Sequence, residues 1–149
     1  MEDLSGIFYI SSFLSEPGST FRLEIDPQST LSEQLKSEGY YGNPNWDITC
    51  PDSLTNFINW AAKKCPAKQY VLILNDHGGG YMPHDDLPAS SNASTRGVIY
   101  DDGHDNKHFS VTSLAQAIRA SDIKPMAVYF DACMMNTIEY LFEMKGVCD

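Results

Sequence analysis

Two uninterrupted apolar runs constrain most strongly how this chain can fold. The first is Tyr70–Asn75 and the second is Met126–Phe130. Neither run alternates between apolar and polar residues, and this continuous pattern is typical of parallel strands that are covered on both faces. Parallel neighbours need a helical crossover, and the chain between the two runs is long enough to supply one. The runs therefore predict an α/β sandwich built around a mostly parallel sheet.

Helical patterns surround the two runs. An apolar stripe predicts a helix that begins at an Asp52 or Ser53 cap and ends at Pro66. A second helix is expected over Val111–Ala120 with Ser110 as its cap, and a third over Met134–Met144. The residues of the third helix that should face the core are Ile138, Leu141 and Phe142.

Shorter elements are predicted elsewhere in the chain. Ile7–Ile10 and Phe21–Ile25 look like a hairpin with its turn at Ser15–Ser19. Thr30 and Glu33 have capping-box spacing and should start a short helix. A small strand, Gly97–Tyr100, interrupts the long polar segment between residues 85 and 106. No repeat is visible, so residues 1–149 are expected to form a single domain.

Composition excludes several partners and compartments. The net charge of −10 disfavours nucleic acid and anionic membrane surfaces, which both repel an acidic protein. No apolar run approaches the ~20 residues of a membrane helix, and the first residues lack a signal peptide, so the chain as written should remain cytoplasmic. The four cysteines contain no Cys-x-x-Cys pair. Cys50 and Cys65 would form a disulfide only in an exported protein, and two separate thiols are favoured.

A thiol and an imidazole follow the two apolar runs. Cys133 and His77 lie 56 positions apart, each just beyond a strand end, where open parallel sheets bind their ligands. A helix directly after Cys133 would favour its thiolate, and His77 could accept the thiol proton. The N–H groups of Gly78 and Cys133 are natural oxyanion donors. Taken singly, Cys133 is more commonly a core residue, and His77 with Gly78 is more commonly a turn. Because both lie at matching strand ends, the pair together favours a catalytic role.

Two motifs then resemble a known family. The segment Tyr70–Tyr81 resembles the histidine strand of clostripain-family cysteine peptidases, and Tyr129–Met135 resembles the segment that contains their cysteine. The stretch Gly97–Asp102 and the helix after it also resemble the segment that joins the two motifs in that family. The resemblance implies a caspase-like α/β/α sandwich with a mostly parallel sheet.

The resemblance also implies a function. It predicts a cysteine endopeptidase that cleaves after Arg or Lys, with His77 and Cys133 as the catalytic dyad. Asp131 would pair with the basic P1 side chain of the substrate; a turn or capping acid is the alternative for this residue. Family members usually extend beyond this chain at both ends, and they are often exported. The domain is therefore expected to be incomplete, with an exposed sheet edge where a partner chain could pair.

Two other functions compete with peptidase activity. One is an inactive, truncated clostripain-like domain that binds peptides or a partner chain along its exposed edge. The other is a caspase-like regulator with a different P1 preference. Hydrolysis of an Arg- or Lys-amide peptide would distinguish the cysteine endopeptidase from these two alternatives.

Self-processing and metal binding complete the expectations. Arg96 and Lys107 lie in the loop where family members are commonly cleaved by their own activity, although solvated loop cations are slightly favoured. The resemblance allows calcium, but Asp101, Asp102 and Asp105 lack EF-hand spacing, and a solvated turn is favoured. No metal site is predicted from the remaining candidate ligands, which have no recognisable spacing. These are His84, Asp85, Asp86, His104 and His108.

Overall fold

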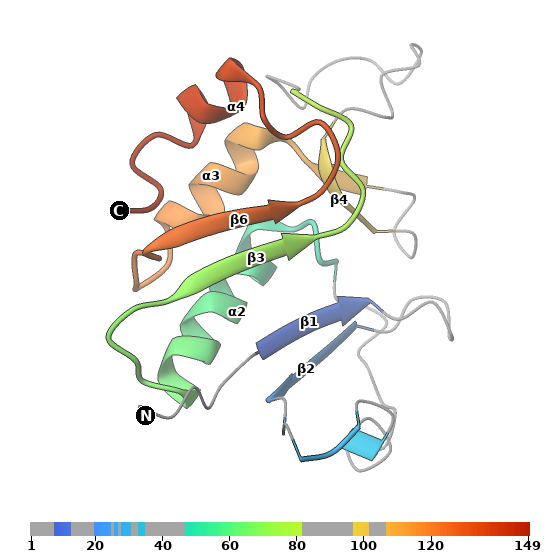
Figure 1. Ribbon diagram of the computed structural model, residues 1–149, viewed down its shortest axis with the longest axis vertical. Helices are drawn as coiled ribbons and strands as arrows, with labels where there is room; N and C mark the ends of the chain where they lie inside the picture. Colours follow the sequence, from blue (N-terminus) through green and yellow to red (C-terminus); the bar gives the residue numbers. More distant parts are fainter. Residues whose placement is uncertain are drawn as a thin grey trace.

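A computed structural model describes residues 8–12, 20–24, 26, 28–30, 33–34, 47–81, 97–101 and 107–149 of the chain (Figure 1). Its strands form three two-stranded sheets, of which β1–β2 and β4–β5 are antiparallel and β3–β6 is parallel. The elements in chain order are β1 (Phe8–Ser12), β2 (Thr20–Glu24), α2 (Pro51–Lys64), β3 (Val71–Asn75), β4 (Val98–Asp101), β5 (Lys107–Phe109), α3 (Val111–Arg119), β6 (Ala127–Asp131) and α4 (Ile138–Glu143).

The two apolar runs form the parallel pair, as predicted. Each strand begins one residue later than expected, and the register runs from Val71 opposite Ala127 to Asn75 opposite Asp131. Figure 1 shows β3 and β6 side by side, with the loops after both strands leaving at the same end. The chain segments that carry His77 and Cys133 therefore start from the same edge of the sheet.

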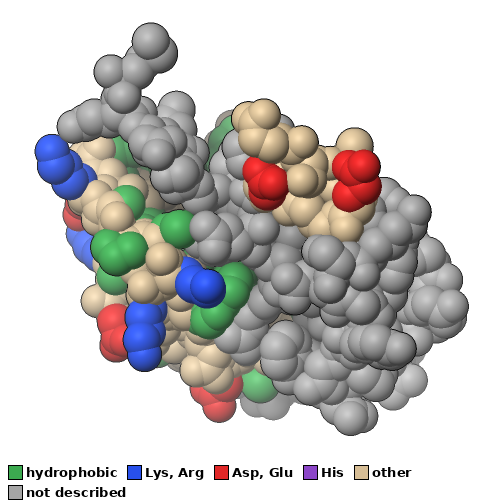
Figure 2. All heavy atoms as spheres, turned by 90° about the horizontal axis from the view of Figure 1, so that it is seen from below, with side chains coloured by type: hydrophobic (Ala, Val, Ile, Leu, Met, Phe, Trp, Pro, Cys, Tyr) green, Lys and Arg blue, Asp and Glu red, His purple; other side chains and the backbone are tan. Residues whose placement is uncertain are grey.

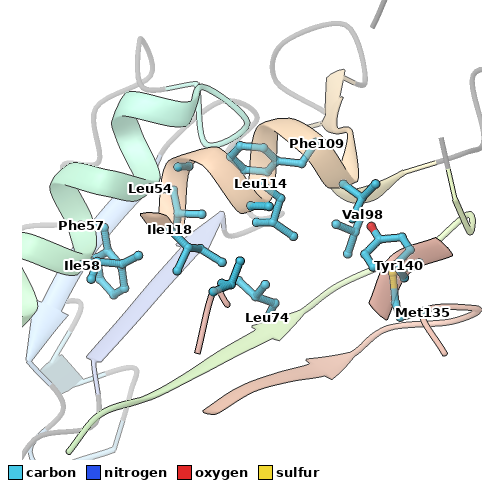
Figure 3. Packing of buried hydrophobic residues seen from close by; sticks show 14 residues of the cluster. Leu54, Phe57, Ile58, Leu74, Val98, Phe109, Leu114, Ile118, Met135 and Tyr140 are labelled. Carbon is cyan, nitrogen blue, oxygen red and sulfur yellow. The ribbon is translucent and has the colours of Figure 1, made fainter. Parts of the chain in front are cut away.

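Helices α2 and α3 cover one face of this parallel pair. Leu54 and Ile58 of α2 meet Leu114 and Ile118 of α3 above Leu74 of β3 (Figure 3). A hydrogen bond from the Thr55 hydroxyl to the Ala117 carbonyl, at 2.8 Å, also joins the two helices. The main core thus lies between the helices and a single face of the sheet.

Helix caps agree with the sequence in part. Ser110 caps α3 as predicted, because its hydroxyl accepts a hydrogen bond from the Ser113 N–H at 3.1 Å. The predicted cap of α2 is wrong: Cys50 is its N-cap, without a side-chain hydrogen bond, and Pro51 takes the first helical turn. Proline fits there because its missing N–H would have no intrahelical partner.

The N-terminal predictions hold where the structure describes them. β1 and β2 form the expected antiparallel hairpin, while its turn at residues 15–19 lies outside the described residues. The capping box is confirmed, since the Thr30 N–H donates to the Glu33 carboxylate at 2.8 Å and the Glu33 N–H donates to the Thr30 hydroxyl at 3.3 Å.

The opposite face of the parallel pair is open. Val71 and Ile73 of β3 and Tyr129 of β6 are exposed, with Ile73 at 61% and Tyr129 at 58%. The described helices that pack on the pair all lie on its other face. The prediction of strands covered on both faces is therefore wrong for the described part of the chain, where one apolar sheet face meets solvent.

Helix α4 differs from its prediction in start and orientation. It begins at Ile138, behind a Thr137 cap, and not at Met134. The three residues expected in the core are instead exposed, whereas Tyr140 is 1% exposed and packs edge-on against Phe130 at 5.6 Å. The apolar spacing identified a hydrophobic stripe on α4 but not which side of the helix is buried. The short helix can bury only one side against α3, and that side carries Tyr140. The exposed residues are Ile138, Leu141 and Phe142.

The guanidinium of Arg119 fixes α4 in this orientation. It donates to the carbonyl oxygens of Glu143 at 2.6 Å and Lys145 at 3.1 Å, at the end of the helix where carbonyls lack intrahelical partners. A charged donor at this end also complements the helix dipole. Arg119 therefore ties the end of α4 to the end of α3.

The four cysteines are free thiols. Cys50 and Cys65 cap opposite ends of the 14-residue helix α2, which at 1.5 Å per residue separates them by about 20 Å. A disulfide needs Cα atoms less than about 7 Å apart, so this pair cannot form one.

The described residues include no helix that is both long and apolar enough to cross a membrane. On the face seen in Figure 2, the Lys and Arg side chains of the described part are interspersed with hydrophobic ones and form no continuous basic patch.

Candidate active site

The segment that carries His77 is held between β3 and β4. The His77 carbonyl accepts a hydrogen bond from the Ile99 N–H at 3.3 Å, and the Gly79 N–H donates to the Gly97 carbonyl at 2.7 Å. These bonds flank an isolated antiparallel bridge between Gly78 and Val98. The backbone on both sides of Gly78 is therefore fixed, while the His77 side chain stays exposed.

Asp76 contributes to this arrangement and was not predicted from the sequence. Its carboxylate accepts the His77 N–H at 2.6 Å and the Tyr100 N–H at 2.8 Å. Asp76 thus links the histidine segment to β4 across 24 positions of sequence. An aspartate directly after a strand is a common turn former, which was the signal available in the sequence.

Gly78 brings the two predicted catalytic segments into contact. A Cβ atom at this position would overlap the Cys133 carbonyl oxygen and would lie 3.0 Å from the Cys133 backbone nitrogen. It would also lie 2.8 Å from the methyl group of Met135. Glycine is required here because the two backbones approach too closely for any side chain. The segment that carries His77 therefore lies against the segment that carries Cys133.

Cys133 does not directly precede a helix, contrary to the prediction. Residues Met134–Thr137 separate Cys133 from α4, so the thiol does not lie at a helix N-terminus. The influence of a helix dipole fades within about one turn. The Cys133 thiol is exposed, and the predicted support from a helix N-terminus is absent.

Backbone strain is concentrated at this site. Ile99 and Met134, with φ of 58° and 59°, are the non-glycine residues in the left-handed region within the described part of the chain. The Ile99 N–H donates to the His77 carbonyl, and Met134 directly follows Cys133. A β-branched residue such as Ile99 adopts this conformation only when its surroundings enforce it, and such strain clusters at functional sites.

Asp131 lies at the same edge of the sheet, as expected. It is exposed, and one oxygen of its carboxylate accepts a hydrogen bond from the Asn75 side-chain amide at 2.6 Å. The Asp131 carbonyl also accepts the Asp76 N–H at 3.3 Å. Three residues named from the sequence, His77, Asp131 and Cys133, are thus gathered where β3 and β6 end.

Lys107 does not lie in a loop. It belongs to β5, opposite Asp101 in the ladder with β4, and forms an ion pair with Asp47 at 3.1 Å. Burial opposes ionisation of Asp47, but hydrogen bonds from Thr49 and Lys107 outweigh it and lower the pKa of Asp47. The other expected cleavage point, Arg96, lies outside the described residues.

Asp101 is a structural residue. It is buried, and its carboxylate accepts the Ile48 N–H at 3.0 Å, which anchors the segment that leads into α2. His108 is half-buried and stacks on Tyr100 at 5.1 Å. Within the described residues no three potential ligands form a metal-binding group. The other residues considered as metal ligands lie outside the described part: His84, Asp85, Asp86, Asp102, His104 and Asp105.

Comparison with known families decides the ancestry of the chain. The model of the clostripain family matches residues 30–149. The chain belongs to the clostripain family. The match includes both segments of the candidate site, so the resemblance seen in the sequence is confirmed. No curated protein matches this clostripain-family chain.

Solved structures support the fold of this clostripain-family chain. One is a secreted C11 cysteine protease from Bacteroides thetaiotaomicron in complex with an irreversible peptide inhibitor, with a TM-score of 0.59 and 21% identity over 73% of this chain. Another is the secreted C11 cysteine protease iotapain from the same organism, with a TM-score of 0.57 and 20% identity over 99% of this chain. The matches cover 28% and 38% of those chains, so this chain spans well under half of either structure. The caspase-like α/β fold is confirmed.

Proposed function

We propose that this chain carries the catalytic centre of a cysteine endopeptidase that cleaves after Arg or Lys. The observation that supports the proposal is the contact of Gly78 with the Cys133 backbone, because it brings the segment that carries His77 against the segment that carries Cys133. The inhibitor bound to the Bacteroides protease supports a peptide substrate. The choice of a basic P1 residue is supported by the exposed carboxylate of Asp131 at the same edge.

The proposed chemistry is acyl transfer in two halves. His77 accepts the proton of Cys133 as the sulfur attacks the scissile carbonyl carbon and forms a C–S bond. The developing oxyanion accepts hydrogen bonds from the N–H groups of Gly78 and Cys133, neither of which donates to another group in the described residues. His77 then returns the proton to the leaving amine, and water hydrolyses the thioester.

These steps require no cofactor, since the chain's own thiol, imidazole and backbone N–H groups supply every function. Asp131 pairs with the guanidinium or ammonium group of the P1 residue. Self-cleavage is proposed at Arg96 alone, because the backbone of Lys107 is already paired in β5.

Hydrolysis of fluorogenic Arg- and Lys-amide peptides tests the proposal. The wild-type chain should release the fluorophore, Cys133→Ala should abolish release, and Cys148→Ala should retain it. Cys148 is a free, half-buried thiol away from the site, so it is the matched control. A folded protein that neither cleaves these peptides nor is labelled at Cys133 by a basic chloromethylketone would contradict the proposal.

A second candidate function is binding of a partner chain beside β6. In the described part of the chain β6 pairs only with β3, so its other edge carries unpaired backbone groups. Helix α4 exposes an apolar stripe that includes Leu141 and Phe142. An added strand could pair with β6 and cover this stripe. Protection of β6 amides from hydrogen exchange by a partner, lost in Phe142→Glu, would support this function.

The solved structures also favour export of this chain. Both Bacteroides structures are of a secreted protease. We infer export for this chain as well, and detection in the culture supernatant, with a cytoplasmic marker absent, would test it.

A further inference from the structure

We propose that Asn75 is a positioning residue, which orients the carboxylate of Asp131 for the basic side chain of the substrate. The inference rests on the proposed function, because it concerns the P1 specificity of the same site. It adds a residue that neither the sequence motifs nor the catalytic chemistry requires.

Asn75 and Asp131 face each other directly. They are register partners at the carboxyl end of the parallel ladder, and the Asn75 Nδ2 lies 2.6 Å from the Asp131 Oδ2. Because the acceptor is a carboxylate, this is a charge-assisted hydrogen bond of the stronger kind. Both residues are exposed, so the bond lies where a substrate could reach it.

The bond orients Asp131 without neutralising it. The terminal torsion of a free aspartate is broad, so an unsupported carboxylate samples many orientations. A Lys or Arg at position 75 would also fix the carboxylate but would cancel its charge. The amide of Asn75 occupies one lone pair of Oδ2. Within the described residues Oδ1 accepts no hydrogen bond and Asp131 has no ion pair. The negative charge therefore remains available to a guanidinium or ammonium group.

The strands do not need this side-chain bond to stay paired. Their backbone ladder runs from Val71 opposite Ala127 to the Asn75–Asp131 pair, and the Asp76 N–H extends it to the Asp131 carbonyl at 3.3 Å. A solvent-exposed side-chain bond at the end of such a ladder adds little to stability. Orientation of the carboxylate is therefore the effect that should be lost when Asn75 is replaced.

The neighbouring register pair suits the rest of a basic side chain. Ile73 and Tyr129 precede Asn75 and Asp131 on the same open face, and both are exposed. Lys and Arg bury their methylene stems along apolar surface while the charged group finds polar partners. Ile73 and Tyr129 lie on the side of Asp131 away from Cys133. The outer methylene groups of a side chain that reaches the carboxylate from Cys133 would therefore pack along them.

The test compares three variants of the purified chain. Asn75→Leu removes the amide donor at similar size, and Asn75→Gln restores an amide. Val71→Leu alters the same strand face four register pairs away. Each is assayed for kcat/KM on peptides with Arg or Leu at P1 and for alkylation of Cys133 by iodoacetamide. Binding of argininamide is followed separately through the amide NMR signal of Asp131.

Asn75→Leu should lower the ratio of Arg to Leu cleavage by about tenfold, the scale of one charge-assisted hydrogen bond. Alkylation should stay within about twofold of wild type, since the thiol is untouched. Asn75→Gln should recover part of the ratio, and Val71→Leu should leave it unchanged. An unchanged ratio in Asn75→Leu, with wild-type cleavage intact, overturns the role of Asn75 but leaves the proposed function standing.

The argininamide measurement separates the two proposals when cleavage fails. If the wild-type chain cleaves nothing but binds argininamide at Asp131, and Asn75→Leu weakens that binding about tenfold, the proposed function fails and the role of Asn75 stands. If the wild-type chain neither cleaves nor binds argininamide, both are overturned.

Discussion

Gly78 and Cys133 are packed backbone to backbone, so closely that a Cβ atom on Gly78 would overlap the carbonyl oxygen of Cys133. The approach joins the loop after β3 to the loop after β6. It places His77, which precedes the glycine, beside the cysteine segment. The absence of a side chain at Gly78 thus allows the loops after β3 and β6 to meet at the candidate site.

Gly78→Ala should separate these loops. The added methyl group has no room against backbone atoms, so we expect the free energy of unfolding to fall by about 1–3 kcal/mol and hydrolysis of Arg-amide peptides to be lost. Gly80→Ala is the matched control, because its left-handed φ of 86° imposes strain while its nearest neighbours lie 3.9 Å away. Urea denaturation and peptide hydrolysis measure both effects. Retained activity in Gly78→Ala would show that the contact is dispensable.

Asp76→Ala should loosen β4 from the histidine segment. Loss of the carboxylate leaves the Tyr100 N–H without its acceptor, and a cost of about 1–3 kcal/mol is expected. Hydrogen exchange of the Tyr100 amide should become faster, and peptide cleavage should weaken because His77 loses its support. Asp122→Ala serves as a control, since within the described residues the Asp122 side chain has no hydrogen bond and its backbone N–H donates to the Asn59 side-chain oxygen. Unchanged exchange at Tyr100 would contradict this role for Asp76.

Helix α4 offers a paired test of its unexpected orientation. Tyr140→Ala should destabilise the chain by about 3–5 kcal/mol, as expected for deletion of a large buried aromatic side chain. Phe142→Ala should change stability by less than about 0.5 kcal/mol, because Phe142 is 75% exposed. Thermal or urea unfolding compares the two directly. Similar losses in both variants would mean that the apolar stripe is covered in solution.

Tyr140 should also make stability depend on alkaline pH. Burial, and secondarily its neighbour Tyr100, raises the pKa of Tyr140 above the ordinary value of about 10. The unfolded chain then loses this proton at a lower pH than the folded chain. The contribution of Tyr140 to stability is therefore fully present below about pH 10 and is lost as the pH rises above it.

Urea midpoints at about pH 8.5 and about pH 10.5 measure this loss against Tyr140→Phe, which has no titrating group at that position. The wild-type midpoint should fall more than that of the variant. At the lower pH, Tyr140→Phe should be no less stable than wild type, because the buried hydroxyl has no hydrogen-bond partner within the described residues. Equal pH dependence would show that Tyr140 is accessible to water.

The sequence was most informative where the pattern was local. The apolar runs predicted β3 and β6, and Ser110 predicted the start of α3, because side-chain periodicity and capping are decided by nearby residues. The motifs around His77 and Cys133 are also local, and they marked two segments that the structure brings together. The three-residue strand β5 was missed, since it has too few residues to show an alternation.

The failures concern contacts between distant segments. Nothing in the stripe of α4 indicated that Tyr140 would be buried while Phe142 faced solvent, because that choice depends on packing against α3 and Phe130. The Asn75–Asp131 bond likewise depends on strand register, which the sequence does not state. The role of Asp76 required knowledge of where β4 lies. Each of these features follows from tertiary packing and has no local signature.

The pairing of β3 with β6 has a consequence for the order of folding. Its partners are 56 positions apart, so the ladder closes only after the chain has lost the entropy of a long loop. Hairpin β1–β2 and the helices rely on nearby residues and can form earlier. Because His77 and Cys133 each follow one strand of this ladder, a partly folded chain holds its thiol and imidazole apart. The proposed dyad can therefore assemble only after β3 and β6 have paired.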